Sequence, residues 1–314
     1  MAKPEKTLIV GLGSMGRRYA RLLPGVGDFE IYGLRSGKGG PCPGVKDLYS
    51  WAEVERVAPK VAFITNPTSL HICTAVKCAG LGMHLFIEKP LNMRLSGLAK
   101  LKKVIKARRL SSYVAYNLRF HPGVAEMREI VRREGFWHAS VRCSSWLPDW
   151  RPDTNHKRSY SANAKMGGGV VLDLSHDADY AHFIFGEISS IEGLARRSSN
   201  VTVDAEDVAD MNLRLKKGGY VPVHLDFCSR FNERTVKFTT REASYELDLI
   251  KGILLTSRGG RVTRKKYMVD RDFTYKAEIR YFFSRLGGKM MNDIDEASSL
   301  LGKLVKFKRG SSLA

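Results

Sequence analysis

The chain has 314 residues, of which 43% are hydrophobic and 27% are charged. It is long enough for two domains and apolar enough to bury a core, which excludes wholesale disorder. The 52 Lys and Arg residues exceed the 32 Asp and Glu residues and give a formal net charge of +20 at pH 7. Such a surplus favours anionic partners, without choosing among nucleic acid, a membrane surface and phosphorylated small molecules.

Cysteine usage and hydropathy indicate the compartment. The 5 cysteines are odd in number and dispersed, with no CxxC pair, which argues against a disulfide scaffold and against a zinc site. The N-terminal residues carry charge but no apolar segment of a secretory signal, and no apolar stretch has the roughly 18 residues of a membrane span. We therefore expect a soluble, cytoplasmic protein without a metal site or membrane partner.

Residues 1–121 are predicted to form a doubly wound α/β domain, a Rossmann fold around a parallel sheet. Short apolar runs alternate there with amphipathic stretches, as in βαβ units. Helices are predicted at residues 15–23, 70–81 and 96–109. The predicted strands are residues 7–10, 29–34, 61–65, 84–88 and 111–116.

Residues 122–314 are predicted to form an α+β domain with a large, mostly antiparallel open sheet. A helix near residues 173–185 is expected to cover one face of that sheet, and residues 306–314 are expected to fray. Glycine-containing turns join several of the segments. The predicted strands are residues 137–146, 188–196, 209–215, 220–231, 234–240, 244–249 and 252–256.

Residues 11–16 read Gly-Leu-Gly-Ser-Met-Gly, a GxGxxG motif between a predicted strand and a predicted helix. In a dinucleotide site the first glycine permits a tight turn, the second admits the pyrophosphate, and the third allows close helix–sheet packing. A bare structural turn is the alternative, but the strand, the helix and the N-terminal position all match a dinucleotide site. The motif predicts cofactor contacts at Gly11, Gly13, Ser14 and Met15.

The end of the second predicted strand bears on the choice of cofactor. An NAD site usually carries an acid about 20 residues beyond the glycines, whereas residues 33–38 contain none. Arg35 can bond the 2′-phosphate of NADP, and Ser36 can add a hydroxyl. Alternatively, Arg35 is one more surface cation of a basic protein. We predict NADP(H), with NAD(H) as the less favoured cofactor.

The tripeptide Glu88-Lys89-Pro90 directly follows a predicted apolar strand. Its side chains are therefore expected at the carboxyl edge of the parallel sheet, where ligands bind in this class of fold. The proline bends the chain and fixes the direction of the lysine before it. The tripeptide is easily matched by chance, but less easily together with the glycine motif some 70 residues earlier.

Together these motifs resemble those of the Gfo/Idh/MocA family, named after glucose–fructose oxidoreductase and inositol dehydrogenase. The resemblance implies an NAD(P)-dependent oxidoreductase with a Rossmann domain and an α+β domain for substrate binding and oligomerisation. It also implies a homodimer or homotetramer through the second-domain sheet. Four further segments carry it: Thr65-Asn66-Pro67 with His71, residues 116–122, Gly167-Gly168-Gly169, and the stretch with Asp173, His176, Asp179 and Phe185-Gly186.

The same resemblance implies further contacts. Around the cofactor these are Thr65, Asn66, Pro67, His71, Glu88, Lys89 and Asn117. The segments before the glycine run resemble a subgroup linked to surface-polysaccharide and nonulosonate-type sugar biosynthesis. Aromatic side chains offer flat faces to sugar rings, and arginines bind carboxylate or phosphate; a packed loop or an oligomer contact is the alternative. The predicted substrate contacts are Arg119, Trp150, Arg151, Arg158, Tyr160 and Asp177.

Oxidation of a sugar hydroxyl requires a hydride acceptor, a base and a cation that favours the developing alkoxide. The nicotinamide supplies the first. We assign the base to His176, because imidazole titrates near neutral pH, the cation to Lys89, and an orienting role to Asp173. Each assignment has an alternative. His176 could be a helix histidine bonded to a neighbouring acid, Lys89 a surface lysine, and Asp173 a charge at a helix start.

The spacing of Asp173 and His176 departs from the pattern of many family members, which place these residues four apart. Here they are three apart, and Asp177 follows the histidine directly. Both spacings lie on one face of a helix, so the sequence leaves open which carboxylate serves His176.

The leading hypothesis is an NADP(H)-dependent oxidoreductase acting on a sugar, a sugar acid or a nucleotide sugar. Reduction of another carbonyl or conjugated substrate on the same scaffold is the alternative within the enzyme class. A non-catalytic dinucleotide sensor could dispense with Lys89, His176 and Asp173, all of which are present. Nucleic-acid binding rests on charge alone, so we expect a small-molecule substrate and no nucleic-acid partner.

Overall fold

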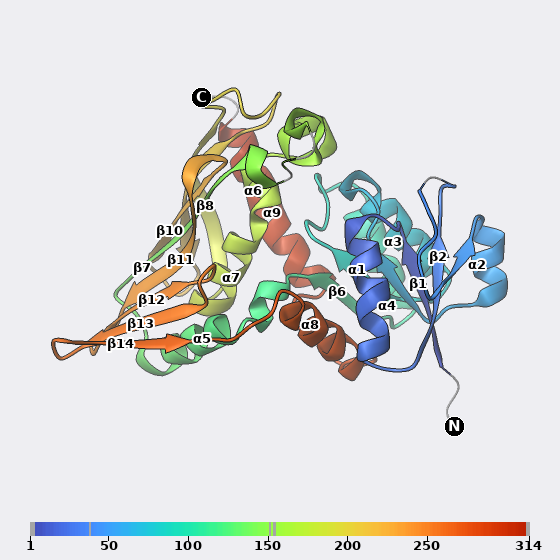
Figure 1. The fold of residues 1–314 in the computed structure, drawn as a ribbon, viewed down its shortest axis with the longest axis horizontal. Helices are drawn as coiled ribbons and strands as arrows, with labels where there is room; N and C mark the ends of the chain where they lie inside the picture. The colour runs from blue at the N-terminus through green and yellow to red at the C-terminus, as the bar shows by residue number, and fades with distance from the viewer. Residues whose placement is uncertain (1–3, 38, 151, 153–154, 312–314) are drawn as a thin grey trace. The chain divides into compact units, whose positions relative to one another are not determined.

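The chain folds into two compact units, which are described separately (Figure 1). The computed structural model describes residues 4–37, 39–150, 152 and 155–311. The first unit comprises Met1–Asn117 and Arg271–Leu301, and the second comprises Leu118–Asp270 and Gly302–Ala314. Residues 271–301 thus fold with the N-terminal unit, whereas the predicted division at residue 121 assigned them to the second domain.

The first unit is built on a six-stranded sheet in the order β3-β2-β1-β4-β5-β6, with every neighbouring pair parallel. This order confirms the predicted doubly wound fold, and ligands in such sheets bind where the strand order reverses, here at β1 and β4. The strands are β1 Glu5–Val10, β2 Phe29–Leu34, β3 Val45–Leu48, β4 Val61–Ile64, β5 His84–Glu88 and β6 Ser112–Ala115. The helices are α1 Ser14–Leu22, α2 Trp51–Val57, α3 His71–Gly80, α4 Leu98–Ala107, α8 Phe273–Ser284 and the first part of α9 Ile294–Ser311.

Aromatic side chains fill the space between the sheet and the helices α1 and α8. Phe63 on β4 stacks on Phe86 on β5, with ring centroids 4.4 Å apart. Tyr19 from α1 and Phe282 from α8 pack edge-on against Phe86, at 5.1 and 5.4 Å. These four side chains are fully buried, and aromatic pairs in such arrangements add to the energy of burial. The core therefore fixes the carboxyl ends of β4 and β5, where the candidate site lies.

β3 and α2 of the first unit, like α8 and α9, are absent from the sequence prediction. β3 has only four residues, and Lys46 and Asp47 interrupt its apolar pattern at the edge of the sheet. α2 follows directly and begins with a capping box, in which Ser50 accepts from the Glu53 N–H and the Glu53 carboxylate accepts from the Ser50 N–H. The Ser-x-x-Glu spacing is a recognised helix-start signal and would have revealed α2.

The second unit is built on an eight-stranded sheet in the order β14-β13-β12-β11-β7-β10-β9-β8. Only the pair of β10 and β7 is parallel, which confirms the predicted, mostly antiparallel sheet. The strands are β7 His138–Trp146, β8 Ile188–Arg196, β9 Val208–Leu215, β10 Tyr220–Asp226, β11 Cys228–Thr239, β12 Ser244–Asp248, β13 Ile253–Arg258 and β14 Arg261–Lys266.

Helices cover one face of the eight-stranded sheet (Figure 1). They are α5 Pro122–Glu134, α6 Val170–Asp173 and α7 Ser175–Phe185. α6 and α7 contact the central strands, and α5 packs against α7. In β9 buried and exposed residues alternate along the strand, as expected when one face is covered and the other is open.

Several predicted boundaries in the second unit are wrong. Leu174, with φ −91° and ψ 23°, divides the predicted helix at 173–185 into α6 and α7. The predicted strand at 220–231 ends at Asp226. β14 has four charged residues among its six and is exposed throughout, so no apolar pattern marks it. The predicted frayed tail is helical to Ser311, and Lys308 there pairs with Glu206 at 2.8 Å.

Candidate active site

The glycine loop between β1 and α1 combines two crowded glycines with an open one. A Cβ on Gly11, which has φ +94°, would lie 2.7 Å from the Asn66 Cα, and one on Gly16 would lie 2.0 Å from the Gly11 carbonyl oxygen. A Cβ on Gly13 would meet no protein atom within 4 Å. Gly11 and Gly16 thus serve packing, whereas Gly13 leaves the backbone accessible to a ligand.

The N-terminus of α1 can receive an anion at this opening. Gly13 is its N-cap, no side chain caps the helix, and its first turn contains no acid. The first N–H groups of a helix lack partners within the helix and carry partial positive charge. Ser14 and Met15 belong to this turn, and Ser14 is exposed. The loop therefore meets the requirements of a pyrophosphate site.

The segment after β4 lies against the glycine loop. Thr65 donates to the Gly11 carbonyl at 2.6 Å, and the Asn66 side-chain amide donates to Thr74 at 2.9 Å. The other side-chain atom of Asn66, Oδ1, is buried and has no hydrogen-bond partner among the described residues. Pro67, which follows, is exposed. An acceptor buried without a donor is costly, and a donor on a bound ligand would relieve that cost.

His71 connects two loops of the predicted site. Its Nε2 lies 2.8 Å from the Asn66 carbonyl oxygen and its Nδ1 lies 3.1 Å from the Pro90 carbonyl oxygen. Burial lowers the pKa of His71 to about 4, so the ring is neutral at physiological pH. A neutral ring has one N–H, so one of these two carbonyls accepts from it, and the buried ring lies between the loops after β4 and β5.

The carboxylate of Glu88 points into the first unit. Glu88 is 8% exposed, and its two oxygens accept from the Tyr19 hydroxyl at 2.6 Å and from the Lys89 N–H at 3.0 Å. The cofactor contact predicted for Glu88 stays a prediction. Lys89, half-buried, follows directly at the carboxyl end of β5. Asn117 is also buried, and its amide donates to Thr274 at 2.7 Å.

Arg35 follows β2 and is already engaged by protein groups. Its Nη1 pairs with Asp47 at 2.9 Å, and its Nη2 donates to the carbonyls of Gly39 and Gly40 at 2.5 and 2.8 Å. The side chain is only 5% exposed. Ser36, next in the chain, is exposed. The sequence identified the cation but gave no sign of Asp47, which lies on the strand that it did not predict.

In the second unit, the glycine run before α6 is required by close packing. A Cβ on Gly168 would lie 2.2 Å from the Tyr160 carbonyl oxygen, and one on Gly169 would lie 2.3 Å from the Glu206 carboxylate. The Tyr160 hydroxyl donates to the Gly167 carbonyl at 2.8 Å. This compact loop leads into α6. Asp173 is the last residue of α6, His176 lies in the first turn of α7, and both side chains are half-buried.

Two predicted substrate contacts are corrected by the structure, because each residue is buried and its charge is paired within the second unit. Asp177 is fully buried, pairs with Arg234 at 2.6 Å and accepts from the Tyr180 hydroxyl. Arg119 makes two hydrogen bonds with Asp179, at 2.7 and 2.8 Å, and both side chains are 1% exposed. Neither residue presents its charge to solvent.

The remaining predicted substrate contacts differ in exposure. Trp150 is 42% exposed, although its indole N–H donates to Ser145 at 3.1 Å. Arg158 is exposed. Arg151 lies outside the described residues. Trp150 and Arg158 thus leave surface available to a ligand, and their role stays a prediction.

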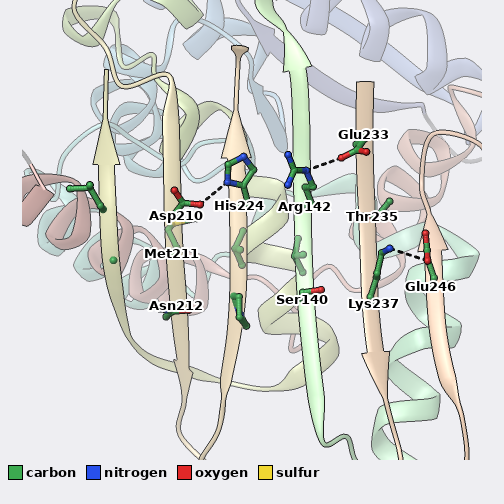
Figure 2. Close-up of a pocket in the computed structure, with 15 residues that line it drawn as sticks. Ser140, Arg142, Asp210, Met211, Asn212, His224, Glu233, Thr235, Lys237 and Glu246 are labelled. Atoms are coloured by element: carbon green, nitrogen blue, oxygen red, sulfur yellow. Dashed lines mark hydrogen bonds and ion pairs between the residues drawn. The ribbon is translucent and has the colours of Figure 1, made fainter. Parts of the chain in front are cut away.

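The open face of the eight-stranded sheet carries a hollow of about 900 Å³, lined by charged, polar and apolar residues, that the sequence analysis did not predict. Figure 2 shows ion pairs across its strands, between Arg142 and Glu233 and between Lys237 and Glu246. His224 lies between Asp210, at 2.6 Å, and the buried Asp226, at 3.0 Å. Association of two copies through this face stays a prediction.

We expect His224 to make stability depend on pH. Hydrogen bonds with Asp226 and Asp210 raise the pKa of His224, against the effect of its burial and the Arg142 charge. The contribution of His224 to folding stability is therefore fully present below the unfolded pKa of about 6.5, and it is lost as pH rises through the folded pKa. Because the ring is 28% exposed, we expect at most about 1 kcal/mol. Urea unfolding of wild type and His224→Gln at about pH 6 and pH 8 tests this; an equal difference at both pH values would contradict it.

A parallel sheet in this strand order, with an open glycine at an uncapped helix N-terminus, defines a dinucleotide-binding domain. The chain belongs to the Gfo/Idh/MocA family. Residues 6–116 match its oxidoreductase model, an NAD-binding Rossmann fold, and residues 124–246 match its C-terminal domain. The predicted family and its oxidoreductase class are thereby confirmed.

Relatives and solved structures agree with this family. The myo-inositol 2-dehydrogenase of Thermotoga maritima is 25% identical over 228 residues, which cover 67% of this chain and 65% of that protein. The levoglucosan dehydrogenase of Pseudarthrobacter phenanthrenivorans is 26% identical over 136 residues, which cover 43% of this chain and 35% of that protein. The chain thus spans about one third to two thirds of the length of the curated relatives it matches.

Two solved structures share the fold over almost the full chain. The UDP-N-acetylglucosamine 3-dehydrogenase of Acidithiobacillus ferrooxidans has a TM-score of 0.81 at 16% identity and covers 99% of each chain. A levoglucosan dehydrogenase in complex with NADH and L-sorbose has a TM-score of 0.85 at 16% identity and covers 98% of this chain and 97% of the other. In the described part of this chain, none of the helices is long and apolar enough to cross a membrane.

Proposed function

We propose that the protein transfers a hydride between NADP(H) and a hydroxyl or carbonyl carbon of a sugar, a sugar acid or a nucleotide sugar. The observation that carries this proposal is the open Gly13 at the uncapped start of α1, in the same unit as Lys89, which directly follows β5. The family to which the chain belongs includes sugar dehydrogenases, among them the inositol and levoglucosan enzymes above.

The residues present fit a dinucleotide. Gly13 and the first N–H groups of α1 would hold the pyrophosphate, and the buried, unpartnered Oδ1 of Asn66 offers an acceptor beside the glycine loop. Thr65 and His71 would keep the surrounding backbone in place. When bound, the nicotinamide supplies the carbon that accepts or returns the hydride.

The chain's own side chains would handle the proton and the developing charge. We assign Lys89 to donate to the substrate oxygen, because an ammonium favours the alkoxide that forms when the carbon loses hydride. We assign His176 to accept the hydroxyl proton, because imidazole can take up and return a proton near neutral pH. Asp173 would orient one of these groups.

Exposed groups of the second unit support a polar, ring-shaped substrate. Trp150 offers an aromatic face and Arg158 a guanidinium, which suit a sugar ring and a carboxylate or phosphate. A substrate of surface-polysaccharide biosynthesis would combine these features. There are two alternatives: the substrate is a different small carbonyl or conjugated compound, or the protein is a dinucleotide sensor without turnover. In either case Trp150 and Arg158 would not bind a sugar.

A substrate screen tests the proposed reaction. The purified protein is incubated with NADP⁺ or NAD⁺ and a panel of sugars, sugar acids and nucleotide sugars, and absorbance of the reduced nicotinamide is followed. Turnover of a panel member, lost in His176→Ala, supports the proposal. Cofactor binding in a thermal-shift assay with no turnover of any panel member, or of simple carbonyl compounds in the reverse direction, would favour the sensor.

We expect Arg35→Ala to weaken NADP⁺ selectively. A hydrogen-bonded guanidinium–phosphate contact contributes about 1.5–3 kcal/mol, so its loss should raise the NADP⁺ KM roughly 10- to 100-fold, whereas the NAD⁺ KM should change little. Arg17→Ala is the matched control, because Arg17 also donates to the Gly40 carbonyl, at 2.6 Å. An unchanged ratio of the two KM values would overturn the preference for NADP(H).

NAD(H) is the second candidate cofactor, and Asp47 is the observation that favours it. Its carboxylate neutralises Arg35, and its Oδ1 is buried without a hydrogen-bond partner among the described residues. An acceptor beside the end of β2 suits the ribose hydroxyls of NAD better than a phosphate. The family model is likewise that of an NAD-binding fold. Asp47→Asn would then raise the NAD⁺ KM and not the NADP⁺ KM.

A further inference from the structure

Two buried carboxyl groups of the first unit share one phenol. The Tyr19 hydroxyl lies 2.6 Å from Oε1 of Glu88 and 3.1 Å from Oε1 of Glu278. The Tyr113 hydroxyl lies 3.4 Å from the second oxygen of Glu278. Tyr19, Tyr113 and Glu278 are 0% exposed, and Glu88 is 8% exposed. The assigned roles of the candidate site use neither Tyr19 nor Glu278.

A proton count determines the state of this cluster. The Tyr19 hydroxyl has one proton and can donate it to only one of the two carboxyls. If both carboxyls were ionised, the second would face a phenol oxygen without a hydrogen between them, in a site walled by aromatic rings. Both contacts are satisfied when one carboxyl is protonated and donates to the Tyr19 oxygen.

The surrounding charges decide which carboxyl holds the proton. Burial raises the pKa of both groups, and the pKa of Glu278 is raised well above its usual value, further so by the Glu88 charge. Glu88 has compensating partners, namely the bond from Tyr19, the N–H and charge of Lys89, and the charge of Arg18. Among the described residues, the groups that lower the pKa of Glu278 are the two tyrosine hydroxyls. The proton therefore belongs to Glu278.

Neighbouring charges leave this assignment unchanged. On α8 the ring of Tyr275 lies under the Arg18 guanidinium, 4.6 Å from its centroid, and Asp272 pairs with Arg18 at 3.8 Å. Asp272 also pairs with Arg21, at 2.8 Å, so the Arg18 charge is left to act on Glu88, whose pKa it lowers. Glu278 lies one helical turn beyond Tyr275. Within the residues that the structure describes, the groups that shift its pKa include no cation.

We infer that Glu278 is a neutral positioning residue for Lys89. Its carboxylic acid donates to the Tyr19 oxygen, Tyr19 donates to the Glu88 carboxylate, and that carboxylate accepts the Lys89 N–H. This directed chain of hydrogen bonds links α8 through α1 to the backbone of the residue to which we assign the charge-stabilising role. The inference rests on the proposed function for its catalytic consequence, but its structural claim does not require turnover.

Infrared spectroscopy tests the protonation claim directly, with no activity required. A protonated carboxylic acid has a carbonyl stretch that a carboxylate lacks. At neutral pH, the spectrum of wild type minus that of Glu278→Gln should contain this band, and it should shift in Tyr19→Phe, which removes the acceptor. Absence of the band from the difference spectrum would show that Glu278 is ionised and would overturn the inference.

The pH dependence of unfolding gives a second test. The unfolded chain releases the Glu278 proton near its ordinary pKa of about 4.3, whereas the folded chain retains it. Relative to Glu278→Gln, wild type should therefore be most stable below that pH, and its unfolding equilibrium constant should rise up to about tenfold per pH unit above it, until the folded pKa is reached. A difference between the two proteins that does not vary with pH would contradict a neutral Glu278.

Kinetics then tests positioning. The side-chain amide that Glu278→Gln introduces can still donate an N–H to the Tyr19 oxygen, so this variant should retain kcat within about threefold, whereas Glu278→Ala and Tyr19→Phe should lower kcat about tenfold or more with a smaller change in KM. Tyr281→Phe is the control on α8: it loses a bond from the Met291 N–H and keeps its ring against Tyr113, and its kcat should match wild type. If Glu278→Ala retained full kcat, or Tyr281→Phe lost as much, the positioning role would be wrong. If wild type shows no turnover, the proposed function fails while the infrared and unfolding tests still decide the state of Glu278.

Discussion

Replacing Lys89 by methionine is expected to lower kcat by about 10²–10⁴-fold, because the variant loses the cation that stabilises the developing alkoxide. Methionine keeps an unbranched side chain of similar length. The hydrogen bond from the Lys89 backbone N–H to Glu88 involves no side-chain atom of Lys89, so it persists. We therefore expect dinucleotide affinity, measured by fluorescence titration, to remain within a few-fold of wild type.

The control for this variant is Lys103→Met, which removes an exposed lysine from α4 of the same unit and should leave kcat unchanged. Single-turnover measurement separates hydride transfer from product release, and the loss should appear in the transfer step. A Lys89→Met protein that turns over at the wild-type rate would rule out the assigned role. A protein that loses cofactor affinity and kcat together would instead place Lys89 in cofactor binding.

The fold of the first unit was largely predictable because its central strands are buried on both faces. β4 is wholly apolar and β5 has the apolar centre Leu85-Phe86-Ile87, and such runs between amphipathic helices specify a parallel sheet. β3 and β14 were missed for the converse reason. Each lies at a sheet edge and carries charged side chains, so neither has the periodic pattern that a buried strand must have.

The candidate site was predictable where its chemistry is local in sequence. The glycine loop needs a strand before it, a helix after it and one open glycine, and all of these lie between Glu5 and Leu22. Partners supplied by distant segments were not predictable. Asp47 meets Arg35 from an unpredicted strand, and Glu278 meets Tyr19 across 259 positions of sequence. Residue type alone does not show whether a carboxylate faces solvent or the core, and this is why Asp177 was assigned to substrate.

Asp177→Ala is expected to destabilise the second unit by about 1.5–3 kcal/mol, since it would leave a partly buried guanidinium without its counter-charge. Arg234 forms two hydrogen bonds with Asp177, at 2.6 and 3.2 Å, and the Asp177 charge helps to hold the pKa of Arg234 well above its usual value. Tyr180 would also lose the acceptor for its hydroxyl. The measurement is urea unfolding followed by a signal from the second unit.

A double-mutant cycle distinguishes this buried pair from a substrate contact. If the pair is structural, Asp177→Leu combined with Arg234→Met should be far less destabilising than either change alone, because apolar side chains of similar volume avoid burying charge. A contact to substrate through Asp177 would behave differently: Asp177→Asn would raise the substrate KM while the unfolding midpoint stayed at its wild-type value. That second pattern would place Asp177 in the substrate site. It would also require another group to hold Arg234, which Asp177 contacts among the described residues.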